Sequence, residues 1–187
     1  EILLSSTLKE MQRVHWTDPD WKTSWGLGFA VRQQDGITLV GHSGSCPGYR
    51  TTLVLEPKNR YAYIVLLNSM EDAGLYANQI RNIILKAKKE KPVSATTNFS
   101  AYTGRYNAQP WGSETQVLPW FGKLAIVPFP SHNPAEGMTL LKHISGDTFR
   151  RILSDESLGE EIRFERDKST GKVTRMWRHS NYSEKLK

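Results

Sequence analysis

The sequence predicts an α+β protein with two parts, an antiparallel sheet flanked by helices and then a small antiparallel β-barrel-like domain. Three patterns predict this fold. Between residues 26 and 68, β-rich runs alternate with Gly, Pro, Asp and Asn turn residues. A helical spacing of apolar residues follows over residues 72–89. Beyond residue 98 the chain contains only short β-like runs.

The first elements are a helix and a hairpin. Residues 4–14 have apolar side chains at helical spacing, and Thr7 and Glu10 are spaced as a capping box. The β-rich runs over residues 26–32 and 37–42 flank an Asp-Gly pair, which is typical of a tight hairpin turn. We therefore expect a helix followed by a two-stranded antiparallel hairpin.

Two further strands and a long helix complete the first part. Residues 49–55 and 61–68 are β-rich and flank a Glu-Pro-Lys-Asn turn. The second of these runs is almost continuously apolar, which predicts a strand covered on both faces. The helix over residues 72–89 has lysines in its last turns, which favour a helix C-terminus, and we expect it to pack on the sheet.

A linker-like stretch separates the two parts. Residues 88–98 change from charged residues to Pro, Ser, Ala and Thr, a composition typical of links between folded units. We therefore expect a boundary near residue 95, with one domain over residues 1–94 and another over residues 95–187. The second domain should be an antiparallel meander, closed or nearly closed into a barrel. Its predicted strands cover residues 102–107, 114–118, 123–128, 138–144, 148–153, 161–166 and 173–179.

Composition narrows the class of protein. A hydrophobic fraction of 38% with six Trp, seven Tyr and six Phe is too high for a disordered chain, and it is too evenly spread for a membrane span. Cys46 is the only cysteine, so no intramolecular disulfide can form. The cysteine content therefore does not identify the cellular compartment. The net charge of +6 comes from scattered Lys and Arg, which argues against nucleic acid as a partner. The first residues carry no start or leader pattern, so we expect a segment upstream.

The most informative segment is Gly-His-Ser-Gly-Ser-Cys-Pro-Gly-Tyr over residues 41–49, at the end of a predicted strand. Gly44 leaves room for a substrate backbone against an exposed strand edge. An imidazole such as that of His42 could donate a hydrogen bond in a cleft. The simpler interpretation is a strand end followed by a turn, which a His-Ser-Gly tripeptide alone would not exclude.

The segment and its surroundings resemble the third motif of the serine β-lactamase and penicillin-binding-protein superfamily. The order of helix, Trp-Gly-Leu-Gly-Phe hairpin, His-Ser-Gly strand, two strands and long helix is similar to the C-terminal half of that catalytic domain. The resemblance covers residues 1 to about 90. It implies a part of a serine hydrolase that forms an acyl-enzyme on a peptide, ester or β-lactam bond, without a cofactor or metal.

The same resemblance implies roles for individual residues. His42 and the backbone N–H of Ser45, as second oxyanion-hole donor, would be catalytic. Ser43, Gly44 and Tyr49 would bind a small-molecule or peptide substrate. The nucleophile of the superfamily lies in a Ser-x-x-Lys motif, which we expect on an upstream segment, so the chain alone should be inactive. A non-catalytic binding or scaffold protein that reuses the fold is the alternative.

Three other motif matches are better explained without catalysis. Ser6 and Lys9 fit Ser-x-x-Lys, but Ser6 precedes His42 by only 36 residues. Residues 169–172 also fit, although their glycine predicts a hairpin turn. Residues 76–78 match the Tyr-x-Asn motif of the superfamily but follow His42 on the predicted helix.

Cys46 with His42 could form a Cys-His dyad or supply two metal ligands, but two ligands are too few for a structural zinc site. A packed or turn cysteine is the simpler interpretation.

The second domain resembles, more loosely, the small lipocalin-like β-barrel that follows the catalytic domain in some relatives. Two interpretations stay open at this point. It could be a structural or homo-oligomerisation barrel, with aromatic residues filling its interior or its contact with the first domain, or a module that binds a ligand at one end. The aromatic residues in question are Trp111, Trp120, Phe121 and Trp177.

Overall fold

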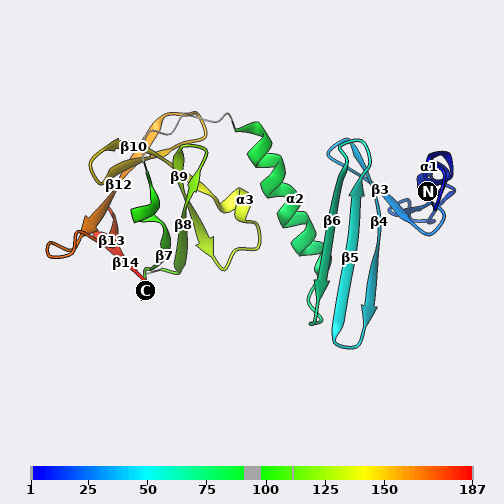
Figure 1. Ribbon diagram of the computed structural model, residues 1–187, viewed down its shortest axis with the longest axis horizontal. Coiled ribbons are helices and arrows are strands. Elements are labelled where there is room, and N and C mark those ends of the chain that lie inside the picture. Colours follow the sequence, from blue (N-terminus) through cyan, green and yellow to red (C-terminus); the bar gives the residue numbers. More distant parts are fainter. Residues whose placement is uncertain (1, 91–97, 111, 187) are drawn as a thin grey trace. The chain divides into compact units, whose positions relative to one another are not determined.

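The computed structural model describes residues 2–90, 98–110 and 112–186. Its contacts divide the chain into two compact units, Glu1–Asn82 and Ile83–Lys187, which are described separately below. The predicted boundary near residue 95 lies outside the described residues. An antiparallel sheet with helices in one unit and a closed antiparallel barrel in the other confirm the predicted α+β class (Figure 1).

The first unit is built on one six-stranded antiparallel sheet in meander order, β1-β2-β3-β4-β5-β6 (Figure 1). Its elements are α1 (Ser5–Gln12), β1 (Trp16–Thr17), β2 (Ser24–Trp25), β3 (Ala30–Gln34), β4 (Ile37–Cys46), β5 (Tyr49–Glu56), β6 (Tyr61–Leu67) and the start of α2 (Ala73–Lys89). The predicted hairpin is confirmed, because Asp35 and Gly36 both adopt positive φ, at 53° and 72°. That conformation is the one required by a type I′ turn.

The first helix is shorter than predicted, and its predicted capping box is wrong. Leu4 is the N-cap of α1 and makes no side-chain capping bond. Thr7 therefore lies inside the helix, where it cannot cap its start. The Glu10 carboxylate is instead bonded to Arg13, at 2.6 Å.

A buried ion pair joins α2 to the sheet. Arg81 is fully buried, and its Nε donates to Glu56 Oε1 at 2.5 Å while its Nη1 donates to Asp35 Oδ2 at 2.9 Å. Glu56 is fully buried as well. Burial opposes its ionisation, but hydrogen bonds from Asn59 and Arg81 hold the pKa of Glu56 below its ordinary value. This pair fixes the position of α2 along β5.

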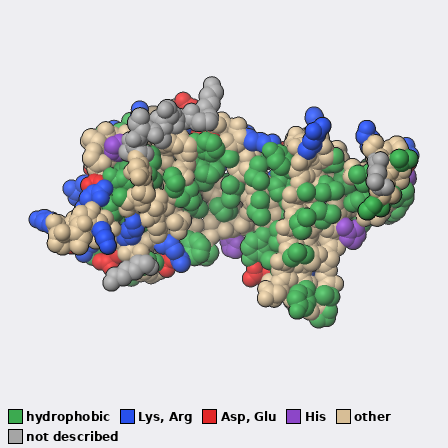
Figure 2. Space-filling model, in the orientation of Figure 1, with side chains coloured by type: hydrophobic (Ala, Val, Ile, Leu, Met, Phe, Trp, Pro, Cys, Tyr) green, Lys and Arg blue, Asp and Glu red, His purple; other side chains and the backbone are tan. Residues whose placement is uncertain are grey.

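The prediction that β6 is covered on both faces is wrong for the described residues. Tyr63 is buried on the same face as Val54 and Glu56. The alternate residues Ile64 and Leu66 are 64% and 74% exposed. Figure 2 shows hydrophobic side chains gathered over the strands of this sheet. Arg81 of α2 contacts the sheet on the Glu56 face, whereas Ile64 and Leu66 form an apolar strip that is open on the other face.

The second unit is a closed barrel with the strand order β10-β11-β12-β13-β14-β7-β8-β9, and every neighbouring pair is antiparallel. The strands are β7 (Gly104–Asn107), β8 (Glu114–Trp120), β9 (Lys123–Phe129), β10 (Thr139–Ser145), β11 (Thr148–Ile152), β12 (Leu158–Arg166), β13 (Val173–Arg178) and β14 (Asn181–Lys185). A 3₁₀ turn, η1 (Ser100–Tyr102), and a short helix, α3 (Pro134–Gly137), complete the unit.

The sequence patterns predicted seven of these strands and missed β14. Its residues Asn-Tyr-Ser-Glu-Lys are mostly polar, so they lack the apolar alternation that marks a strand. Backbone pairing with β13 on one side and β7 on the other forms it. The missed strand closes the barrel, because an all-antiparallel barrel needs an even number of strands.

Phenylalanine and tyrosine, rather than tryptophan, dominate the aromatic part of the barrel core. The buried cluster includes Phe99, Tyr102, Tyr106, Phe149 and Phe164. Of the two places predicted for Trp120, Phe121 and Trp177, the barrel interior is wrong, since none of them is buried, and a contact with the first domain stays a prediction. Trp177 follows the inward-facing Met176 and therefore points outward. Trp111 lies outside the described residues.

The Asp147 carboxylate ties η1 to the barrel. It accepts hydrogen bonds from Tyr102 Oη at 2.8 Å and from Arg166 Nε at 2.9 Å. The Arg166 guanidinium is the main reason that the pKa of Asp147 is lowered, and the Tyr102 hydroxyl adds to it against the effect of partial burial. The charged form of Asp147 is therefore part of the folded barrel.

Asp147→Asn should destabilise the barrel at neutral pH by about 1–2 kcal/mol, since charged hydrogen bonds are lost at a partly exposed site. The folded-state pKa of Asp147 lies below the ordinary value of about 3.9, so the ionised carboxylate stabilises the barrel above about pH 3.9. This stabilisation is lost as the pH falls through the lower, folded-state pKa. The difference in urea midpoint between wild type and variant should therefore shrink in acid. Glu161→Gln, at an exposed position of β12, is the control. A pH-independent difference would contradict the assignment.

No helix in the described parts of the chain has the length and apolar character needed to cross a membrane.

Candidate active site

The end of β4 is a strand edge with one open side. β3 pairs with β4 only as far as the Ala30–Gly41 pair, whereas β5 pairs with β4 to its end at Cys46. Among the described residues, no strand pairs with residues 42–46 on the β3 side. The backbone groups on that side are therefore free to hydrogen-bond to an added extended segment.

Four of the predicted site residues lie on this open edge and Tyr49 lies beside its end, and all five are exposed. Residues 42–45 form consecutive positions of β4, and Tyr49 begins β5 opposite Cys46. Because side chains alternate along a strand, His42 and Gly44 face one side of the sheet and Ser43 and Ser45 the other. The edge thus presents an imidazole on one face and two hydroxyls on the opposite face.

His42 has one ring nitrogen engaged with the backbone. Its Nδ1 lies 2.7 Å from the carbonyl oxygen of Ser43. Because a carbonyl oxygen can only accept, Nδ1 carries the hydrogen of this bond, and Nε2 of the neutral ring is left with a lone pair. The Trp25 ring lies nearby, with 6.3 Å between ring centroids. The imidazole is therefore oriented, with Nε2 able to accept a proton.

Two glycines of β4 are constrained by the neighbouring strand. A side chain at Gly41 would overlap the carbonyl oxygen of Leu53 on β5. At Gly44, a Cβ would lie 2.6 Å from Thr51 Oγ1. Both positions allow β4 and β5 to approach closely, which is a frequent use of glycine in strands.

A small cavity lies on the face of the sheet that carries the two serines. It has a volume of about 120 Å³ and is lined by Ser43, Ser45, Arg50 and the first residues of α2. The Nε of Arg50 is shielded from solvent and has no hydrogen-bond partner among the described residues. The sequence motifs did not single out Arg50. The Pro-Gly turn is the sequence signal that could have identified Arg50, because a two-residue hairpin turn places it directly opposite Ser45.

The remaining motif matches lie where the sequence predicts. Ser6 is an exposed residue of α1. Residues 76–78 lie within α2, where Tyr76 donates to the Glu71 carboxylate and Ala77 is buried. Residues 169–172 form the connection between β12 and β13, with Gly171 at a φ of 69°. The surroundings of these three motif matches do not indicate a serine nucleophile.

Cys46 is exposed, and the four residue-to-residue steps of extended strand from His42 to Cys46 span roughly 13 Å, too far for a direct Cys-His dyad. Within the described ranges, no three His, Cys, Asp or Glu side chains come together as metal ligands.

Comparison with known proteins gives one family and several solved structures. The beta-lactamase family model matches residues 2–88. A crystal structure of SurE with D-Leu is 20% identical at a TM-score of 0.38, covering 98% of this chain and 44% of its own. The octameric penicillin-binding protein homologue from Pyrococcus abyssi is 18% identical at a TM-score of 0.43, with 98% and 42% covered.

The chain thus spans less than half the length of these solved structures. No protein of curated function matches it. Residues 2–88 are therefore similar to the beta-lactamase family, and an antiparallel barrel of eight strands follows them in the chain.

Proposed function

We propose that this chain contributes one wall of the active site of a serine hydrolase that works through an acyl-enzyme. The observation that carries the proposal is the open edge of β4 over residues 42–46, at the position of the His-Ser-Gly motif. The family match over residues 2–88 supports it. The substrate is a compound with a peptide, ester or β-lactam bond.

In the proposed reaction, an extended substrate lies along the open edge and contacts Ser43, Gly44 and Tyr49. A serine nucleophile attacks the scissile carbonyl carbon, and the backbone N–H of Ser45 donates to the oxygen as it becomes negative. The bond to the leaving group then breaks, and water hydrolyses the acyl-serine. His42 Nε2 accepts and returns a proton within this network, since Nδ1 is held by the Ser43 carbonyl.

The nucleophile, in a Ser-x-x-Lys motif, lies on a segment outside these 187 residues. The apolar strip on the sheet supports this part of the proposal. His42, Leu53 and Ile64 are paired across β4, β5 and β6, so the exposed Ile64 lies on the same face as the imidazole. Covering exposed apolar side chains with a further segment would be favourable by about 25 cal/mol per Å² of buried apolar area.

Activity-based labelling tests the proposal. A fluorescent fluorophosphonate or penicillin probe should acylate the full-length protein and should leave this chain unlabelled. Labelling at Ser6 would overturn the assignment of the nucleophile. A full-length protein that no probe labels, and that has no upstream Ser-x-x-Lys, would instead be a binding or scaffold protein on the same fold.

A further inference from the structure

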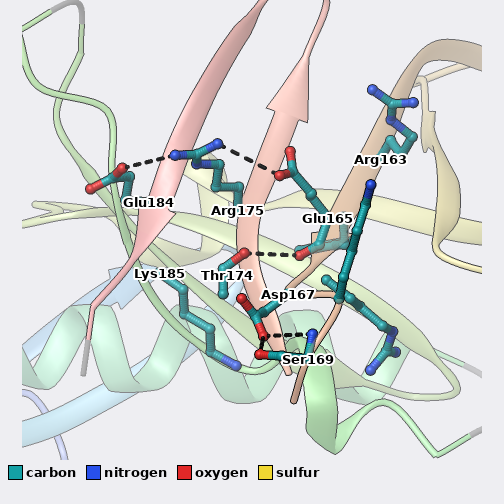
Figure 3. Close-up of a pocket in the computed structure, with 11 residues that line it drawn as sticks. Arg163, Glu165, Asp167, Ser169, Thr174, Arg175, Glu184 and Lys185 are labelled. Atoms are coloured by element: carbon teal, nitrogen blue, oxygen red, sulfur yellow. Dashed lines mark hydrogen bonds and ion pairs between the residues drawn. The ribbon is translucent and has the colours of Figure 1, made fainter. Parts of the chain in front are cut away.

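A broad, cationic groove crosses the second unit at the ends of β12, β13 and β14 (Figure 3). It consists of two adjoining hollows with volumes of about 900 and 620 Å³. Arg166, Thr174 and Lys185 line both hollows, so they mark the place where the two meet. A ligand that fills the groove would contact these three residues.

The charges of the groove do not balance. Six cationic side chains and three carboxylates line the two hollows. Glu165 and Glu184 both pair with Arg175 at 3.6 Å, and Figure 3 shows Arg175 between them. Asp167 accepts hydrogen bonds from Ser169 and Thr170. The three carboxylates therefore interact with Arg175 or with nearby hydroxyl groups, and the groove keeps an excess of positive charge.

Lys185 is held in place at the junction. Its Nζ donates to the carbonyl oxygen of Ala101 at 2.8 Å and lies 5.9 Å from the centroid of the Tyr106 ring. A Cβ at Gly104 would approach Lys185 Cε to 2.9 Å, so the glycine makes room for the lysine stem. Burial and the nearby Arg166 guanidinium lower the pKa of Lys185. No carboxylate among the described residues pairs with this ammonium group.

Arg166 is held by other contacts beside it. Its Nε donates to both oxygens of Asp147, at 2.9 and 3.1 Å, and its Nη1 donates to the Gly171 carbonyl at 2.9 Å. Asp147 thus compensates the charge of Arg166, whereas the charge of the neighbouring Lys185 is not compensated by a carboxylate of the described residues. Two fixed cations next to each other repel, and an anion that contacts both relieves the repulsion.

We infer that this groove binds an oxyanion group, phosphate or carboxylate, at the junction of Lys185 and Arg166. Two of the three Nζ hydrogens remain available after the bond to Ala101. Arg163 and Lys168 line the larger hollow without an ion pair to the described residues. Further anionic groups of the same ligand would reach them, so the ligand class is an organic polyanion rather than a single small ion.

Titrations of the whole chain, followed in amide NMR spectra at constant ionic strength with chloride as the reference salt, test the inference. Inorganic phosphate and acetate should each give saturable shifts at residues 166, 174 and 185, with a dissociation constant on the order of millimolar. The tighter of the two identifies the preferred oxyanion. Tripolyphosphate should bind at least ten times more tightly than phosphate. Shifts that are unsaturable and spread over all basic residues would refute a site.

Matched variants complete the test. Lys185→Met should weaken phosphate binding about tenfold or more, and Lys142→Met, which removes an exposed lysine of β10, should leave it unchanged. Lys185→Gln removes the charge but keeps a donor for Ala101, so it serves if the methionine variant does not fold. A folded Lys185→Gln chain that binds phosphate as wild type does would overturn the inference. If neither variant folds, the local, saturable response of the wild-type chain decides.

Discussion

Arg81→Met should lower the free energy of unfolding of the first unit by about 3–5 kcal/mol, the range typical of breaking a buried ion pair from one side. The substitution removes the partner of Glu56, whose side chain is 0% exposed, and the bond from Nη1 to Asp35. Tyr63 and Asn59 alone would then hydrogen-bond to the Glu56 carboxylate. Urea unfolding followed by circular dichroism measures the loss.

The pH dependence of the Arg81→Met variant supplies a second readout. Burial opposes the ionisation of Glu56, and the substitution removes the Arg81 contribution that lowers its pKa, so the folded-state pKa of Glu56 should rise above its wild-type position. In the wild type, the lowered folded-state pKa contributes stability above the unfolded pKa of about 4.3, and this stability is lost as the pH falls through the folded value. The variant lacks the share of it that Arg81 provides. The penalty of the substitution should therefore be smaller in acid than at neutral pH.

Controls separate the ion pair from the loss of side-chain volume. Lys58→Met, in the exposed turn between β5 and β6, should change stability by less than about 0.5 kcal/mol. Arg81→Met combined with Glu56→Leu should be more stable than Arg81→Met alone, because no uncompensated buried charge remains. A double variant no better than the single one would contradict the role assigned to the pair.

His42→Ala in the full-length protein should reduce kcat/KM by about 10²–10⁴-fold, the range typical of a lost general acid–base group. The proposed function underlies this expectation. The ring is exposed, and its one hydrogen bond among the described residues goes to the carbonyl of the next residue, so the effect on folding should be small. A panel of chromogenic β-lactam and p-nitrophenyl ester substrates measures the rates, and thermal unfolding measures stability.

The matched control for His42 lies on the same strand. Thr38 is an exposed residue of β4 within the part that pairs with β3, away from the open edge. Thr38→Ala should leave the rate within about twofold of wild type. If the two substitutions lower the rate equally, or if His42→Ala acts only by unfolding the protein, the imidazole has no catalytic role.

Local sequence signals were sufficient for most of the strand pairs. Asp35-Gly36 and Pro47-Gly48 define two-residue turns whose backbone angles few other residue pairs adopt at low cost. A turn of fixed length also sets the register, so Ser45 opposite Arg50 follows from the turn between them. The His-Ser-Gly segment could be recognised in the same way, because its chemistry lies in consecutive residues.

Other features depended on partners far away in the sequence. β14 carries no apolar alternation, and its pairing with β7 joins residues that are more than seventy positions apart. Whether a face of β6 is exposed depends on which elements pack against it, and the sequence of the strand does not contain that information. The turn places Arg50 opposite Ser45, but the cavity beside it also needs the first residues of α2, which lie more than twenty positions further along the chain.

By itself, the sequence of this protein determined the α+β class, the meander of β3, β4, β5 and β6 but not the short strands β1 and β2, the barrel character of the second unit and the strand that carries His42. These depend on residues close together in the chain, where turn geometry and alternation act directly. Tertiary structure alone decided the Arg81–Glu56 pair, the closure of the barrel by β14 and the cationic groove at Lys185. Each of these joins groups from distant positions, because burial and charge compensation depend on distance in space.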